Sequence, residues 1–460
     1  MASAAPTVDL DRNSWTSRWA FPRRLGGPMG SHHGRLSAAW AYVFATLSWL
    51  ICMARQMPCR QGVLSESPDR FGWMCYTDIT ALYFSRGQAT GGAPYITVDW
   101  EYPVLTGYFA TIANAISQFF GANLSAGIDG DQSLVNGHIY FAVTAVMLFA
   151  CLIWLVTSVL RTVPQTPVLA MAVAISPTLW ANALINWDLF VIALTAAGLA
   201  AWVNKKPVWA GLWWGWAIAA KFYPLVIVGA LAVLCVRPEA LRTLEPLKAW
   251  LKMAGTALAA WLVVNLPMMM THFSGWAYFY TFNYSDRGAD LGSFWYSLTL
   301  MGVTLTHASA WSRAVMLIGF GLLAILIYFA RKPPSAWQIA YLAVAIMVSA
   351  NLVYSPQYVL WLLPLIVLCR PRLFDLTLFT AGELIYFVLI WMLLKGDNLT
   401  LGISSAPWAY IFAVWLLLGV TIWLMSRVVR DIMHGDPAAE INFDVNLIPR
   451  RSLSQRFVTT

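Results

Sequence analysis

About twelve apolar runs follow one another along this chain, and each is near the length that a helix needs to cross a membrane. The chain is 59% hydrophobic and only 11% charged, with a mean hydropathy of +0.63. This composition excludes an ordinary soluble domain and predicts an all-α, polytopic membrane protein. The runs cover roughly residues 37–55, 136–160, 165–184, 187–203, 207–220, 222–236, 250–270, 309–330, 337–351, 354–369, 373–394 and 406–426.

The basic residues indicate how these runs are oriented. If the runs cross the membrane alternately, 21 of the 29 Lys and Arg residues fall on one side. By the positive-inside rule this side, which also holds both termini, is the cytoplasmic face of the cell membrane. The net charge of +8 therefore marks a membrane face rather than a nucleic-acid-binding surface. We expect disordered cytoplasmic tails at 1–36 and 431–460, a transmembrane domain at 37–430, and large outer loops at 56–135 and 271–300.

The first outer loop mixes acidic and aromatic residues. The stretch 75–105 contains Asp78, Asp99 and Glu101 among five Tyr and Trp residues, one of which is Tyr102. Aromatic rings stack on the apolar face of a sugar, and a carboxylate held near a sugar hydroxyl can act as a general base. The pattern favours carbohydrate chemistry on the outer face.

Two further features of this loop bear on its structure. Residues 103–120 have helical periodicity but include polar residues, which predicts an amphipathic helix lying on the membrane surface. Cys59 and Cys75 either form a disulfide or remain free thiols. No Cys or His spacing is typical of a metal site, and we expect neither a metal nor a cofactor.

Other polar residues are predicted at the outer ends of the apolar runs. Each also has a simpler interpretation, such as capping a helix, bracing a proline turn or reaching lipid headgroups. Glu383 lies inside a run, where an ionisable group indicates either a function or a buried helix–helix partner. The outer residues are Asp188, Lys221, Tyr223, Tyr354 and Gln357, with Arg287 in the loop 271–300.

The donor class follows from what the sequence lacks. It has neither a dinucleotide-binding fingerprint nor a phosphate-binding P-loop. Since nucleotide donors are normally absent outside the cell, a sugar used on the outer face would arrive on a lipid phosphate. A phosphate leaving group needs cations, and Lys221 and Arg287 are the candidates.

Five segments between about residues 70 and 370 resemble the glycosyltransferase C superfamily, and most of all family 87, the actinobacterial polyprenyl-phosphate-sugar transferases. The resemblance implies a bundle of about twelve transmembrane helices whose long first outer loop carries the catalytic Asp, here Asp78. It also implies transfer of mannose or arabinofuranose from decaprenyl phosphate to lipoglycan or arabinan. The segments are YTDITALY, GGAPY, WEYPVLTG, KFYP and NLVYSPQYVLWLLP.

Together these observations predict an inverting transferase that moves mannose from a polyprenyl phosphate to a cell-envelope glycolipid or lipoglycan, with Asp78 as general base. One alternative is transfer of arabinofuranose. Two others, from different classes, are a lipid-linked sugar transporter or flippase and a non-catalytic binder of lipid-linked sugars. The residues expected to contact the sugar or the acceptor are Glu101, Tyr102, Asp188, Tyr223, Tyr354 and Gln357.

Overall fold

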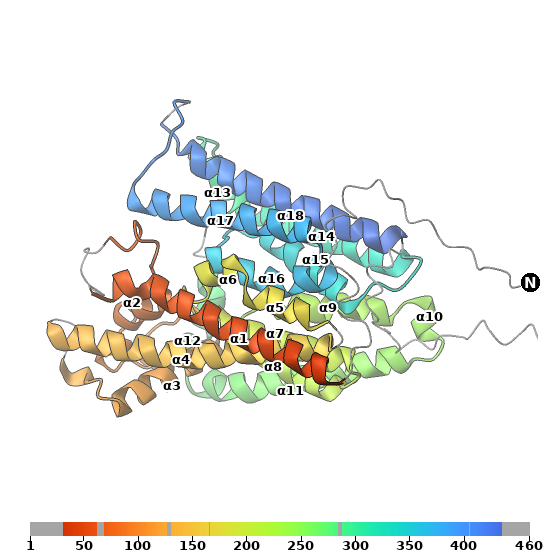
Figure 1. Cartoon of the computed structure of the whole chain (residues 1–460), viewed down its shortest axis with the longest axis horizontal. Coiled ribbons are helices and arrows are strands. Elements are labelled where there is room, and N and C mark those ends of the chain that lie inside the picture. Colours follow the sequence, from red (N-terminus) through yellow and green to blue (C-terminus); the bar gives the residue numbers. More distant parts are fainter. Residues whose placement is uncertain are drawn as a thin grey trace, which may run out of the picture.

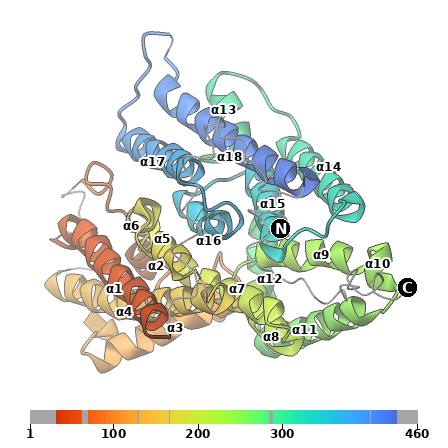
Figure 2. The same cartoon turned by 45° about the vertical axis from the view of Figure 1, so that its right-hand side comes forward.

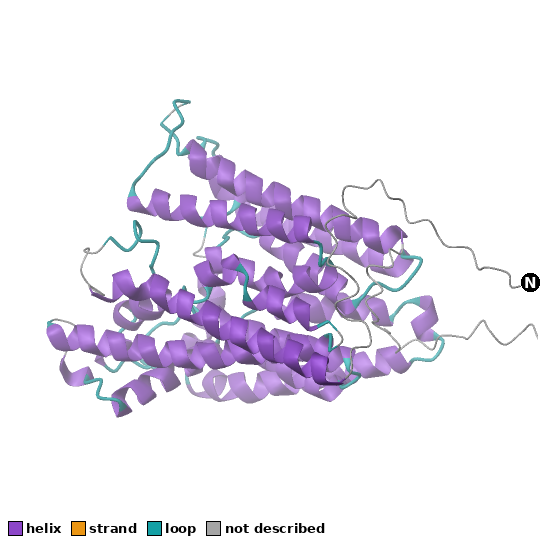
Figure 3. Cartoon of the chain, in the orientation of Figure 1, coloured by secondary structure: helices purple, strands orange, loops and turns teal. Residues whose placement is uncertain are grey.

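The chain is described here from a computed structural model, which covers residues 31–61, 69–126, 130–164, 166–283, 288–403 and 405–434. Within these ranges the regular elements are helices (Figure 3), as the sequence predicts. Their bounds are α1 Ser31–Gln56, η2 Met57–Gln61, α2 Asp78–Ser85, η3 Gln88–Thr90, α3 Val104–Phe119, η4 Leu124–Ala126, α4 Asp131–Thr162, α5 Pro167–Ala174, α6 Pro177–Asn182, α7 Asp188–Val203, α8 Pro207–Ala220, α9 Pro224–Cys235, α10 Pro238–Leu241, α11 Glu245–Thr271, α12 Phe273–Thr281, α13 Phe294–Leu300, α14 Ala308–Phe329, α15 Ala336–Ala350, η6 Pro356–Tyr358, α16 Val359–Cys369, α17 Leu373–Lys395 and α18 Trp408–His434.

The long helices run beside one another along the longest axis of the molecule (Figure 1). In both views α17 and α18 lie on one side and α1 and α4 on the other (Figure 2). Every residue of α16 is buried, which places this helix in the core. Six helices of the described ranges are long and apolar enough to cross a membrane, namely Ala38–Arg60, Asp131–Thr162, Glu245–Thr271, Ala308–Phe329, Leu373–Lys395 and Trp408–His434.

Each predicted apolar run coincides with helix, but the number of membrane crossings stays a prediction. The run 165–184 divides into α5 and α6, because Pro177 lacks an N–H and begins a new helix. The helices α1 and α18 extend beyond the predicted runs, to Ser31 and His434. Most of the two predicted tails lies outside the described residues.

The segment 56–135, which the sequence predicts to be the first outer loop, contains the helix predicted at 103–120, which is α3. Phe109, Ala110 and Ala113 are buried on one face, where Phe109 meets Phe190 of α7 with ring centroids 4.7 Å apart. Ile112 and Phe119 are exposed on the other. The amphipathic helix is confirmed, and its place on a membrane surface stays a prediction.

A disulfide joins Cys59, just after α1, to Cys75, just before α2. The sequence analysis left this pair open. Arg55 adds to the same junction, since its guanidinium donates hydrogen bonds to the carbonyl oxygen of Met74, just before Cys75, and to that of Trp180 in α6. The end of α1 therefore holds the segment that leads into α2.

At the opposite end of the molecule, two buried arginines tie helix ends together. The Nε of Arg370 lies 2.6 Å from the Oδ2 of Asp375, and its guanidinium also pairs with Asp431 of α18. The Nη2 of Arg237 donates to the carbonyl oxygen of Ala330, 2.7 Å away, after α14. The basic clusters thus gather at one end and the acids of the first outer loop at the other.

The helices α8 and α11 pack closely because Gly211 and Gly215, four residues apart, lack side chains. A Cβ at Gly211 would overlap the carbonyl oxygen of Met253, and one at Gly215 would overlap that of Ala257. Small residues at this spacing let helix backbones approach each other within a membrane. The contact fixes α8, and with it Lys221 at its end.

Candidate active site

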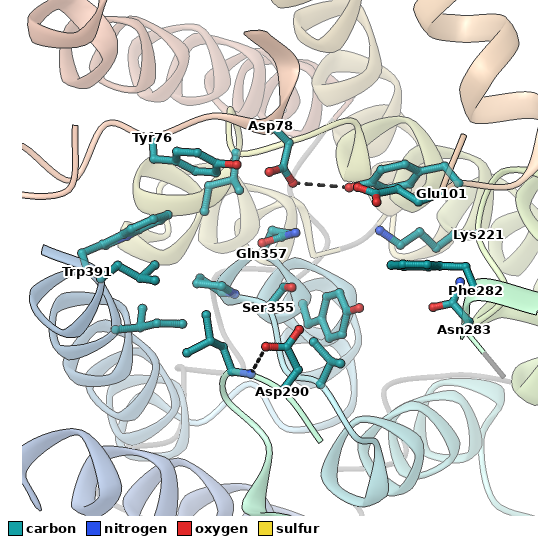
Figure 4. A pocket seen from close by; sticks show the side chains of 18 of the residues that line it. Tyr76, Asp78, Glu101, Lys221, Phe282, Asn283, Asp290, Ser355, Gln357 and Trp391 are labelled. Carbon is teal, nitrogen blue, oxygen red and sulfur yellow. Dashed lines mark hydrogen bonds between the residues drawn. The ribbon is translucent and has the colours of Figure 1, made fainter. Parts of the chain in front are cut away.

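A cavity of about 670 Å³ opens at the end of the molecule where the first outer loop meets the ends of α8 and α17 (Figure 4). It lies within the size range of small-ligand sites. It is lined by Arg70, Phe71, Tyr76, Asp78, Glu101, Tyr102, Pro103, Ile185, Lys221, Phe279, Phe282, Asn283, Gly288, Ala289, Asp290, Leu291, Val353, Ser355, Pro356, Gln357, Tyr358, Ile390, Trp391 and Leu394.

Asp78 is placed by the start of α2. Thr77 is the N-cap, and its hydroxyl accepts a hydrogen bond of 3.2 Å from the backbone N–H of Ile79. The same hydroxyl donates to the carbonyl oxygen of Ile185, and the backbone N–H of Asp78 donates to that oxygen at 2.7 Å. The turn before α2 is therefore fastened to the loop before α7.

The carboxyl group of Asp78 faces the cavity. Its Oδ2 accepts a hydrogen bond of 3.3 Å from the Tyr102 hydroxyl. Burial raises the pKa of this carboxyl to about 6, and the negative charge of Glu101 adds to the rise. A hydrogen bond from Tyr76, the charge of Lys221 and the hydrogen bond from Tyr102 partly offset it. The group is ionised above pH 6 but remains a usable base.

Lys221 enters the cavity from the end of α8. The helix stops there because the following Pro224 begins α9, and Lys221 has the extended conformation of a C-cap. Its Nζ lies 2.9 Å from Oδ1 of the buried Asp188. The ammonium also lies 4.8 Å from the ring centre of Tyr102 and 5.4 Å from that of Trp361. This cation is held rigidly at the wall of the cavity.

The predicted site residues that lie in the described ranges divide into two groups. Asp78, Glu101, Tyr102, Lys221 and Gln357 come together on the cavity wall. The Oε2 of Glu101 is also 2.6 Å from the Nη2 of Arg86.

The other group lies behind the wall, namely Asp188, Tyr223 and Tyr354. Asp188 holds Lys221. The Tyr223 hydroxyl donates to Thr195, 3.0 Å away, and its ring stacks on Trp361 with centroids 4.4 Å apart. The Tyr354 hydroxyl donates to the Oε1 of Glu383 at 2.7 Å, so Glu383 has a buried partner.

Arg287 lies outside the described residues, and its predicted role stays a prediction. The chain is described again from Gly288, and Asp290 lines the cavity. The Oδ1 of Asp290 accepts a hydrogen bond of 2.7 Å from the backbone N–H of Leu291.

Sequence reasoning missed Arg70 and an aromatic wall. The guanidinium of Arg70 lies 5.1 Å from the ring centre of Phe71 and 5.6 Å from that of Tyr76. Trp391 of α17 completes the wall, with its ring 6.0 Å from Phe71 and 5.6 Å from Tyr76. Arg70 could have been noticed because it precedes Asp78 in the same loop, whereas Trp391 sits among ordinary apolar helix residues. Within the described ranges, no three His, Cys, Asp or Glu side chains gather as a metal site would require.

Comparison with known proteins defines the class. The model of glycosyltransferase family 87 matches residues 132–356, just under half of the chain. With its apolar helices, the molecule is a membrane glycosyltransferase. Of the cavity residues, Lys221 lies inside the matched region, while Arg70, Asp78 and Glu101 precede it.

Two other comparisons add little. No curated protein matches the chain significantly. Among solved structures, the chain is similar to ArnT from Cupriavidus metallidurans bound to undecaprenyl phosphate, with 13% identity over 85% of this chain and 78% of that one. The TM-score is 0.41, so this similarity contributes nothing to the assignment.

Proposed function

We propose that this glycosyltransferase moves a sugar, with mannose favoured, from a polyprenyl phosphate to a glycolipid or lipoglycan acceptor of the cell envelope. The observation that carries the proposal is one cavity that holds a carboxyl group with a raised pKa, two cations and an aromatic wall. The carboxyl belongs to Asp78, the cations to Lys221 and Arg70, and the wall to Phe71, Tyr76 and Trp391.

The proposed reaction is a single displacement. The Asp78 carboxylate takes the proton of the acceptor hydroxyl as its oxygen attacks the anomeric carbon. The bond between that carbon and the phosphate oxygen breaks, and the lipid phosphate leaves with the bonding electrons. One displacement inverts the anomeric configuration, whereas retention would need a carboxylate that forms a covalent sugar intermediate.

The two cations are suited to the leaving group. Fixed positive groups stabilise charge that develops on a phosphate in the transition state. The Lys221 side chain is 15% exposed and lies against its aromatic neighbours, while Arg70 is exposed at the mouth of the cavity and pairs with no carboxylate of the described ranges. Arg70 therefore joins Lys221, and Arg287 as the sequence predicts, among the candidate phosphate ligands.

The disulfide supports an outer-face site. Cys59–Cys75 lies at the same end of the molecule as Asp78, and disulfides persist in oxidising compartments outside the cytoplasm. Donors there would be lipid-linked rather than nucleotide-linked, in agreement with the missing nucleotide motifs.

The central test is Asp78→Asn. It keeps the size of the side chain and loses its basicity, so turnover should fall by roughly two to four decades while donor binding survives. Asp99→Asn is the matched control, because Asp99 is exposed in the same loop and does not line the cavity. The assay uses purified protein in nanodiscs with polyprenyl-phosphate mannose and polyprenyl-phosphate arabinose in parallel, and it records the anomeric configuration of the product.

The pH profile gives the same test a second readout. Because the base must be ionised, the wild-type rate should fall about tenfold per pH unit below pH 6 and level off above it. The Asp78→Asn variant should lose this acidic limb. Near-normal turnover in that variant, or a product that retains the configuration of the donor, would refute the proposed mechanism.

A further inference from the structure

A second cavity, of about 570 Å³, lies at the opposite end of the molecule from Asp78. Three neighbouring helices build it, each with residues at one-turn spacing. Its lining residues are Trp154, Ser158 and Arg161 on α4, Ala197, Ala200, Ala201 and Asn204 on and just after α7, and Lys206, Trp209 and Trp213 at the start of α8.

The shape of this groove follows from the residue sizes. Residues four and seven apart share a helix face, so each helix contributes one strip of side chains. Ala197, Ala200 and Ala201 leave α7 as a low floor between α4 and α8. Trp154 and Trp213 meet across this floor with ring centroids 5.0 Å apart in an edge-to-face arrangement. The floor and the two rings form an apolar inner part.

The groove is basic at its other end. Arg161 is the last residue of the strip on α4, and Lys206 is the first residue of the strip on α8. Both side chains are exposed. The side-chain amide of Asn204 donates to the carbonyl oxygen of Arg161, 3.2 Å away, and so holds the ends of α4 and α7 together. None of the described residues that line the groove is acidic. The groove therefore has two cations at one end, with no acidic residue among its described lining residues, and an apolar inner part lined by tryptophan, called the slot below.

We propose that this groove binds an anionic glycerophospholipid of the surrounding membrane. The phosphate of the headgroup would lie between Arg161 and Lys206, and the glycerol and upper acyl chain would lie along Trp209 and Trp213. Basic pockets between membrane helices bind anionic headgroups in this way, and Trp rings favour the boundary between headgroup and acyl chain. Trp209 is 54% exposed, which leaves the slot open toward the lipid. The site is separate from the transfer reaction and does not depend on it.

The test titrates the purified full chain, in a detergent with uncharged headgroups, with phosphatidylglycerol, phosphatidylcholine and inorganic phosphate. Native mass spectrometry counts the lipids retained. We expect phosphatidylglycerol to be retained in preference to phosphatidylcholine. Arg161→Ala with Lys206→Ala should weaken its binding roughly 10- to 30-fold, since each removes one cation near the headgroup.

Two further variants complete the test. Arg242→Ala with Lys252→Ala removes the same charge from exposed residues at the same end, outside the groove, and should leave binding unchanged. Ala201→Leu fills the slot without a change of charge and should abolish retention, even if the double variant fails to fold. Equal retention of phosphatidylcholine, unchanged binding in Ala201→Leu, or displacement of the lipid by inorganic phosphate would overturn the proposal.

Discussion

The two cations of the proposed catalytic cavity are held in different ways, and this difference decides which of them can be tested cleanly. Lys221 is the partner of Asp188, whose side chain is 2% exposed. Its removal would leave a buried carboxylate unpaired, which usually destabilises a protein strongly. The Arg70 side chain is exposed and packs its guanidinium on aromatic rings, with no carboxylate partner in the described ranges, so its loss should affect the reaction more than the fold.

We therefore expect Arg70→Ala to slow transfer roughly 10- to 100-fold, because a charge-assisted contact to phosphate typically contributes about 1.5–3 kcal/mol. Arg60→Ala is a matched control. Arg60 also lies over an aromatic ring, that of Phe141 at 5.8 Å, near the end of α1 and away from the cavity lining. The measurement is the transfer rate at saturating acceptor, together with the melting temperature. Equal rates for the two variants would remove Arg70 from the site.

At the scale of elements, two loops distant in sequence join to form one wall of the cavity. The backbone N–H of Tyr354 donates to the carbonyl oxygen of Leu291 at 3.0 Å. The N–H of Gly292 donates to the Tyr410 hydroxyl of α18 at 2.6 Å, and the Tyr386 hydroxyl of α17 donates to the carbonyl oxygen of Tyr354 at 2.6 Å. These bonds fix the position of Gln357, a few residues further on.

Gly292 is the point at which this junction can be broken. Its φ is +77°, and a Cβ there would overlap both the carbonyl oxygen of Tyr354 and the hydroxyl of Tyr386. Gly302→Ala is the control, since Gly302 has a φ of +87° but no neighbour within 4 Å. We expect Gly292→Ala to cost about 1–3 kcal/mol more in the free energy of unfolding than Gly302→Ala, as overpacking typically does, and to slow transfer. Equal melting temperatures for the two variants would show that the junction accommodates the added Cβ without a loss in the free energy of unfolding.

At the scale of the whole molecule, the proposed catalytic cavity and the clustered basic residues lie at opposite ends. The cavity lies where α8 and α17 end and where α7 and α9 begin. The basic residues gather where α9 and α16 end, as the ion pairs of Arg237 and Arg370 show. Helices that run alternately in opposite directions bring about this separation. The catalytic cavity and the lipid groove would then face opposite sides of the membrane.

Cysteine labelling in intact cells tests this orientation. Ile96→Cys and Arg242→Cys each introduce a thiol at an exposed position, one in the first outer loop and one after α10. A reagent that cannot cross the membrane should label the first at once and the second only after permeabilisation. The wild-type chain is the control, because its four free cysteines are buried. Labelling of both variants from one side would contradict the predicted orientation.

The sequence by itself determined the helices and named the candidate residues of the site. A run of apolar residues forms a helix in a membrane whatever its neighbours are, because its backbone polar groups must pair within the run. Local sequence also shows where the turn after Lys221 ends, because Pro224 begins a helix. The helix α3 can be recognised from the periodicity of its own residues. Asp78, Glu101, Tyr102, Lys221 and Gln357 could be chosen because each lies in a recognisable local segment.

Only the tertiary structure decided how these residues are used. It paired Asp188 with Lys221 and Tyr354 with Glu383, behind the residues that line the cavity. It also brought Trp391 to Tyr76 across more than three hundred residues of chain. Such contacts depend on how helices pack against one another, and no local pattern encodes them. The sequence names the side chains, and packing over long distances determines which of them share a cavity.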